Sequence, residues 1–332
     1  MAYSSGTATD QNDLLDRLKT FLTGVGPGWT ALKDTVVAAS PADGANRYIL
    51  FDAPGGGSDN IYTGIELNMR LNTRDALQSY YKPFFRIQGY SGHDAGLGFD
   101  TQPTAIPTAN NVPTFAVEFD RPLPYHFIAN GRRCIIAVQS GRFWSTAYMG
   151  WYLPFATPAQ LNAEPLLIAG SNYTGQAGST TAKDQPHADK HICYQMGLHD
   201  TDTGSNIQHK EGLNWVGMAR RTWPFYDNNV NGSETSDNKY FWRDPEYDSW
   251  DYNSGDTTQA MLNLDGTPPL IPVHLIGDES GGDIFGVYDG VYAVGGDRFV
   301  LQDDIVSVGG VDHLLIEAIP YSRASMIALK LE

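Results

Sequence analysis

The sequence predicts a mainly β protein: antiparallel sheets in a sandwich or barrel-like arrangement, one N-terminal amphipathic helix and long irregular loops. Short runs of aromatic and β-branched residues recur along the chain, separated by Gly, Pro, Asn and Asp. Only one segment spaces its apolar residues with a helical period. At 332 residues and 41% hydrophobic residues, the chain can bury one large core or two to three smaller ones.

Differences in composition and in hydrophobic pattern divide the chain into four regions. These are a helix and docking segment (1–30), a β domain (31–170), a loop-rich aromatic and polar region (171–260) and a C-terminal β-meander (261–332).

The helix is expected over residues 10–24. Its apolar side chains share one face at helical spacing: Leu14, Leu15, Leu18, Phe21 and Leu22. Thr9 or Asp10 can cap the first free N–H groups, and Gly24 can end the helix in the left-handed conformation. The aromatic ring of Trp29 can then fix the helix to a sheet.

The β domain contains seven strand-like runs. They cover 47–51, 60–71, 80–87, 114–119, 125–129, 133–139 and 145–153. Asn130-Gly131 lies between two of them and predicts a hairpin with a type I′ turn, which needs positive φ at both central residues. The C-terminal runs 290–300, 304–319 and 327–332 predict a meander with Gly-Gly turns.

The middle region has few periodic apolar runs and many Asn, Asp, Ser, Thr and Gly residues. Its large aromatic residues are candidates for contact with a partner or a glycan: Trp223, Tyr226, Trp242, Tyr247, Trp250 and Tyr252. The alternative is that these rings pin long loops to the core.

Charge and composition narrow the function classes. A net charge of −16 disfavours direct binding to nucleic acid. The sequence shows no signal-peptide pattern and no apolar run of about 20 residues, so we expect neither export nor membrane insertion. Two cysteines, Cys134 and Cys193, do not form a disulfide framework and suit synthesis in a reducing cytoplasm.

Two segments resemble metal sites only weakly. His187, His191 and Cys193 could ligate zinc, but the surrounding loop sequence provides no framework for a fourth ligand. Asp200, Asp202 and Glu211 occupy positions of a calcium loop, but its glycine falls one position early and flanking helices are absent. We therefore expect no metal and no cofactor.

Catalytic patterns are equally weak. The sequence has no G-x-S-x-G elbow for a nucleophilic serine. A glycan-cleaving enzyme would need two opposed carboxylates, and one acidic cluster could supply them: Asp244, Glu246, Asp248 and Asp251. The sequence gives no sign that these carboxylates oppose each other, so we expect the protein not to be an enzyme.

Several segments resemble a family of virion structural proteins of tailed bacteriophages, which belongs to the tail or baseplate. The resemblance is carried by 91–100, 124–133, 147–158 and 168–171, together with both ends of the chain, while 171–259 matches weakly. It implies synthesis in the host bacterial cytoplasm, assembly into the virion tail or baseplate, and contacts with copies of itself and other tail proteins.

The expected function is therefore that of a structural subunit in the tail, baseplate or fibre-attachment apparatus, working through symmetric assembly. The helix face from Leu14 to Leu22 is the candidate assembly contact. One alternative is a receptor-binding module whose aromatic loops stack on host surface polysaccharide. A less favoured alternative is a glycan depolymerase.

Overall fold

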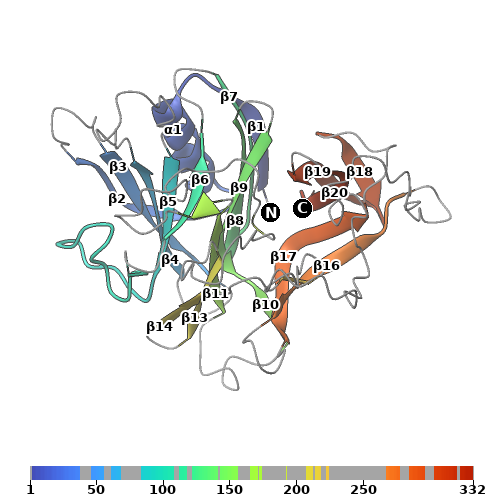
Figure 1. Cartoon of the computed structure of the whole chain (residues 1–332). Coiled ribbons are helices and arrows are strands. Elements are labelled where there is room, and N and C mark those ends of the chain that lie inside the picture. The colour runs from blue at the N-terminus through green and yellow to red at the C-terminus, as the bar shows by residue number, and fades with distance from the viewer. Residues whose placement is uncertain are drawn as a thin grey trace, which may run out of the picture.

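The computed structural model confirms the mainly β fold, with three open antiparallel sheets in its described residues (Figure 1). The described residues are 2–37, 46–55, 61–68, 84–107, 112–117, 122–140, 143–155, 165–170, 172–173, 192, 207–211, 214–217, 222–223, 267–276, 284–295, 303–319 and 322–331. Within them there is one helix, α1 (Gln11–Leu22). None of the three sheets closes into a barrel.

Sheet A has seven strands. Their order is β1 (Ala2–Ala8), β7 (Leu123–Ala129), β8 (Arg133–Ser140), β9 (Phe143–Trp151), β11 (Leu166–Gly170), β13 (Ile207–Glu211) and β14 (Asn214–Gly217). Its middle strands are apolar on both faces; β11, for example, is buried along its whole length. A strand of this kind is typical of a sheet that is covered on both sides.

Sheets B and C lie on either side of sheet A. Sheet B has the order β12 (Asn172–Tyr173), β6 (Pro113–Ala116), β5 (Phe84–Tyr90), β4 (Ile61–Asn68), β3 (Asn46–Ala53) and β2 (Thr30–Val37). Sheet C has the order β15 (Thr222–Trp223), β16 (Leu270–Ile276), β17 (Ile284–Gly295), β20 (Ser322–Lys330), β19 (Val311–Ile319) and β18 (Ile305–Val308), and β10 (Leu153–Pro154) also pairs with β17.

Two apolar cores join the three layers in the order B, A, C. Phe127 and Ile136 of sheet A pack in one core with residues of sheet B and α1. Alternate residues of the same strands, such as Ile128 and Ile135, pack in the second core with residues of sheet C. The period of two along a strand therefore sends successive side chains into different cores.

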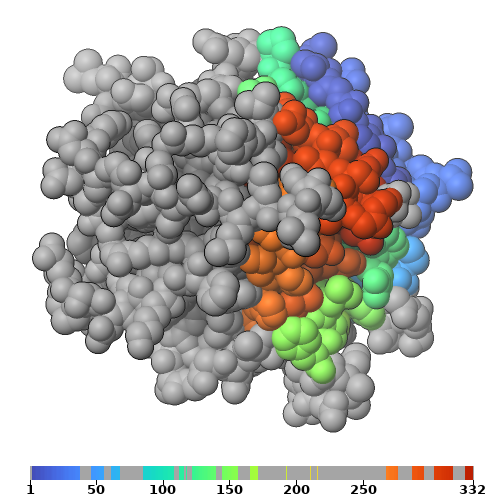
Figure 2. Space-filling model, turned by 90° about the vertical axis from the view of Figure 1, so that its right-hand side faces the viewer, coloured from blue at the N-terminus to red at the C-terminus, as the bar shows by residue number. Residues whose placement is uncertain are grey.

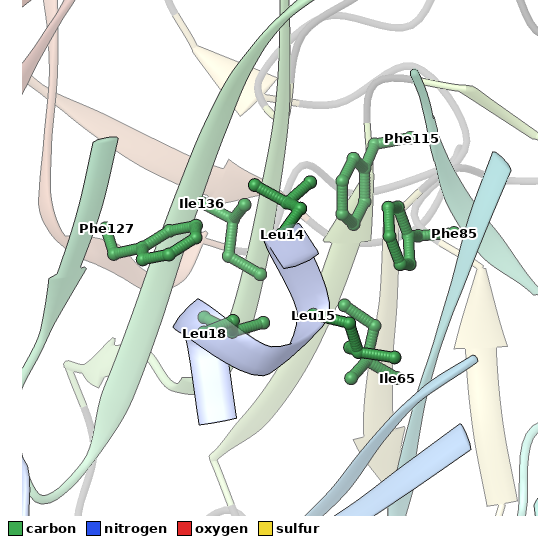
Figure 3. A pocket seen from close by; sticks show the side chains of 8 residues that line it. All are labelled: Leu14, Leu15, Leu18, Ile65, Phe85, Phe115, Phe127 and Ile136. Atoms are coloured by element: carbon green, nitrogen blue, oxygen red, sulfur yellow. The ribbon is translucent and has the colours of Figure 1, made fainter. Parts of the chain in front are cut away.

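Helix α1 fills the space between sheets A and B (Figure 3). Leu14, Leu15 and Leu18 point toward aromatic and aliphatic side chains of both sheets, and the cluster is entirely apolar. Burying each leucine contributes about 1.5–3 kcal/mol. Phe21 is only partly buried and lies 5.8 Å from the ring of Phe127.

The ends of α1 show one confirmed and one wrong expectation. Asp10 caps the helix, and its carboxylate accepts hydrogen bonds from the N–H groups of Asn12 and Asp13. The left-handed ending at Gly24 is wrong: the helix ends at Leu22 with Thr23 as its cap, and the first glycine with positive φ after the helix is Gly28. Trp29 then returns to the core, where its indole N–H donates to the carbonyl of Asn130.

The hairpin around Asn130 is confirmed, because β7 and β8 pair from Ala129↔Cys134 onward. Its predicted type I′ turn is wrong, since neither Asn130 nor Gly131 has positive φ. The Asn130 side chain accepts hydrogen bonds from the N–H groups of Arg132 and Arg133 instead. This side-chain acceptor closes the turn without left-handed backbone.

Candidate functional site

Most of the aromatic candidates lie outside the described residues. Trp223 belongs to β15, which pairs with β16. The other five, Tyr226, Trp242, Tyr247, Trp250 and Tyr252, fall outside the described ranges, as do His187, His191, Cys193, Asp200, Asp202 and the acidic cluster from Asp244 to Asp251. Glu211 is the last residue of β13.

The apolar face of α1 faces the interior of its own chain. Leu14, Leu15, Leu18 and Leu22 are each at most 2% exposed. These side chains contact sheets A and B, so they are core residues and do not present a surface to a neighbouring subunit.

The surfaces that remain for contact include the sheet edges. An edge strand exposes a row of backbone N–H and C=O groups, which another chain can pair with unless the edge is short, charged or bulged. Four of the six terminal strands in the described sheets are short: β12 and β15 have two residues each, and β14 and β18 have four each.

The long edge of sheet B, β2, is interrupted in two ways. Its pairing with β3 shifts register between Ala31 and Lys33, as a β-bulge does. Charged side chains also lie along it: Lys33 donates to two carbonyls of the 91–107 loop, and Asp34 accepts from Arg47. The hydrogen bond from Arg47 lowers the pKa of Asp34 to about 2, so this carboxylate stays charged at neutral pH. Both devices oppose pairing with another strand.

The edge of sheet A, β1, has neither device. Its seven residues pair with β7 in continuous register from Ala2↔Ala129 to Ala8↔Leu123. The strand contains no charged residue and no proline. Ser5, Gly6 and Thr7 are exposed. Among the edges that the structure describes, β1 is therefore the long, regular and uncharged one.

A hydrogen-bonded chain anchors β1 to two sheets. The Tyr3 hydroxyl lies 2.9 Å from Nδ1 of His126 on β7, and the two rings stack. Nε2 of the same imidazole lies 3.1 Å from Oδ1 of Asp303, which lies two residues before β18. Figure 2 views the molecule from the side of sheet C, where blue N-terminal residues lie beside red C-terminal residues.

Both ring nitrogens of His126 are engaged, and Trp144 packs 4.8 Å from the ring. Burial lowers the pKa of His126, while the carboxylate of Asp303 acts in the opposite direction. The lowered pKa favours the neutral imidazole, which lies between a hydroxyl and a carboxylate. This arrangement fixes the position of β1 against both sheets.

A buried ion pair makes a second link between sheets A and C. Arg133 of β8 is fully buried, and its Nε lies 3.2 Å from Oδ2 of Asp289 on β17. Gly290 follows with φ of 76°, and a Cβ at this position would overlap the guanidinium of Arg133. The glycine is needed there both for its backbone conformation and for space.

The 91–107 loop, which includes one of the motifs named above, covers the outer face of sheet B. Gln88 exchanges two hydrogen bonds with the backbone of Ile106, and the Tyr90 hydroxyl donates to the carbonyl of Phe99. Arg86 pairs with both Glu66 and Asp100. These contacts hold the loop on the sheet, which is a structural role.

Among the residues that the structure describes, no three His, Cys, Asp or Glu side chains gather closely enough to hold a metal ion. In the same ranges, no helix is long and apolar enough to span a membrane. No family model matches the chain, and no curated protein is similar enough to count as a relative.

Proposed function

We propose that this protein is a structural subunit of a tailed-bacteriophage virion, in the tail, baseplate or fibre-attachment apparatus, and that it works through symmetric assembly with other copies and with other tail proteins. The motifs at 91–100, 124–133, 147–158 and 168–171 support the virion assignment by their resemblance. The proposal includes no catalytic step and no cofactor.

The observation that carries the assembly role is the edge of sheet A. In the described part of the chain the three layers are held together by apolar packing and by polar links that include Tyr3–His126–Asp303 and Arg133–Asp289. The backbone of β1, in contrast, is left regular and uncharged. A three-layer scaffold with such an edge among its described strands suits a subunit that adds to a neighbour by strand pairing.

Quantitative mass spectrometry of purified virions tests this proposal. In particles of the phage whose genome encodes the chain, its copy number per particle should be a fixed multiple of the symmetry order of the tail. Absence of the chain from purified particles would contradict the proposal. As a control for a host-contact role, the purified chain is added during infection; a structural subunit should not reduce adsorption, whereas a receptor-binding module should.

A further inference from the structure

We propose that β1 pairs in antiparallel orientation with β1 of a second copy, centred on Ser5, so that two central sheets join into one continuous sheet. This inference deepens the proposed function and rests on it for its biological role. The pairing itself can be measured on the purified chain.

The sequence of β1 favours a second copy as the partner because it is nearly symmetric about Ser5. Antiparallel pairing on this centre places Ala2 opposite Ala8, Tyr3 opposite Thr7 and Ser4 opposite Gly6, while Ser5 faces its own counterpart. A two-fold interface requires this kind of self-complementarity, since the same patch is used by both subunits. Each opposed pair includes at least one small side chain, so the two strands can approach closely.

Charge also favours the pairing of like strands here. The whole chain carries a net charge of −16, so two copies repel each other on average. The seven residues of β1 carry no charge. Like charges directly opposite each other destabilise a strand pair, and this edge has none to oppose.

The backbone of β1 is already ordered for pairing. Its inner side is bonded to β7 along all seven residues, and Tyr3 is fixed through His126. Ala2 shares a face of the strand with buried Ala8, and this face lies on the side of sheet B. Gly26 lies close to the Cβ of Ala2 on that side. Because the strand is preorganised, little further ordering opposes the association.

Cysteine trapping tests the pairing and its register. In the proposed register the two Ser5 Cβ atoms lie about 4.5–5.5 Å apart, so Ser5→Cys should form a disulfide-linked or short bis-maleimide-linked dimer. Thr7→Cys is the matched control: it is also exposed on β1, but the two Thr7 positions lie about 13 Å apart, four residues at about 3.3 Å each. The parent chain, which retains Cys134 and Cys193, gives the background.

The expected result is a covalent dimer of Ser5→Cys that forms at least tenfold faster than that of Thr7→Cys. Equal rates for the two variants, or no dimer above the parent background, would overturn the proposal. A charge pair gives an independent check, since Ser5→Lys and Ser5→Glu should each reduce pairing, and their equimolar mixture should restore it. Failure of the mixture to exceed either variant alone would count against a centre at Ser5.

The outcomes separate this inference from the proposed function. Trapping of Ser5→Cys in solution, together with absence of the chain from virions, would contradict the virion role and leave the pairing established. Presence of the chain in virions, with no specific trapping, would overturn the pairing and leave the virion role standing.

Discussion

His126 on β7 and Asp303 beside β18 are separated by 177 positions in the sequence, yet Nε2 of the imidazole lies 3.1 Å from Oδ1 of the carboxylate. This contact joins sheet A to sheet C at β7, the strand next to the edge strand β1. The Tyr3 hydroxyl meets the other ring nitrogen, so the position of β1 depends on the same imidazole.

The first prediction concerns pH. Burial lowers the pKa of His126 below its ordinary value of 6.5. The unfolded chain therefore binds a proton at this site more readily than the folded chain, and stability falls as the pH drops through about 6.5. Replacing His126→Gln removes the titration, so the variant should lose less stability between pH 7 and pH 5. Chemical denaturation at both pH values measures this, and an unchanged pH dependence would contradict it.

The second prediction concerns the buried ion pair. Asp289→Asn should lower the free energy of unfolding by about 3–5 kcal/mol, because the buried guanidinium of Arg133 loses the negative charge beside it. Asp312→Asn is the control, since Asp312 is exposed, and it should change stability by less than about 0.5 kcal/mol. In urea denaturation, the double variant Arg133→Met with Asp289→Leu should lose less free energy of unfolding than the two single variants, Arg133→Met and Asp289→Leu, lose together. Additive losses would show that the two groups do not interact.

The third prediction compares two glycines with positive φ. At Gly290 a Cβ would overlap the guanidinium of Arg133, whereas at Gly309 nothing lies within 4 Å of the position of a Cβ. Gly309→Ala should therefore cost only the left-handed strain, about 1–2 kcal/mol. Gly290→Ala should cost clearly more, because steric overlap adds to the strain. Thermal unfolding of both variants measures the difference. Equal unfolding midpoints would mean that β17 can move away from Arg133 at no cost in stability.

The fourth prediction tests whether α1 belongs to the core. Leu15 is 1% exposed, and Leu15→Ala should lower stability by about 2–5 kcal/mol. Thr20→Ala, on the exposed side of the same helix, should have little effect. If α1 served as a docking helix for another subunit, the isolated chain would tolerate both substitutions equally.

The strands with aromatic and β-branched residues could be predicted from the sequence, and so could α1. Aromatic and β-branched side chains suit a buried sheet, so they predict strands at Tyr48 to Phe51 and at Phe127 to Ala129. The strand β1 could not be found in this way, because Ala2–Ala8 contains mostly Ala, Ser and Gly. Its pairing with β7, more than a hundred residues away, supplies the order that local preference lacks.

The candidate site, the edge strand β1, depends on the order of the strands in sheet A. Local sequence patterns do not give that order, so they indicated the helix face and the aromatic loops instead. The leucines of α1 form an amphipathic pattern, and such a pattern does not say whether the apolar face covers its own sheets or a neighbour. Edges are likewise a property of topology: Lys33 and the bulge at β2 have a meaning only once β2 is known to end a sheet. Symmetry about Ser5 becomes informative only after β1 is placed at an edge.

An electron-microscopic reconstruction of the virion tests the central claim most directly. The account predicts that density for the three stacked sheets occurs in symmetric copies in the tail, baseplate or fibre-attachment region. Particles whose tail density is fully explained by other chains, with no place for these three sheets, would contradict it.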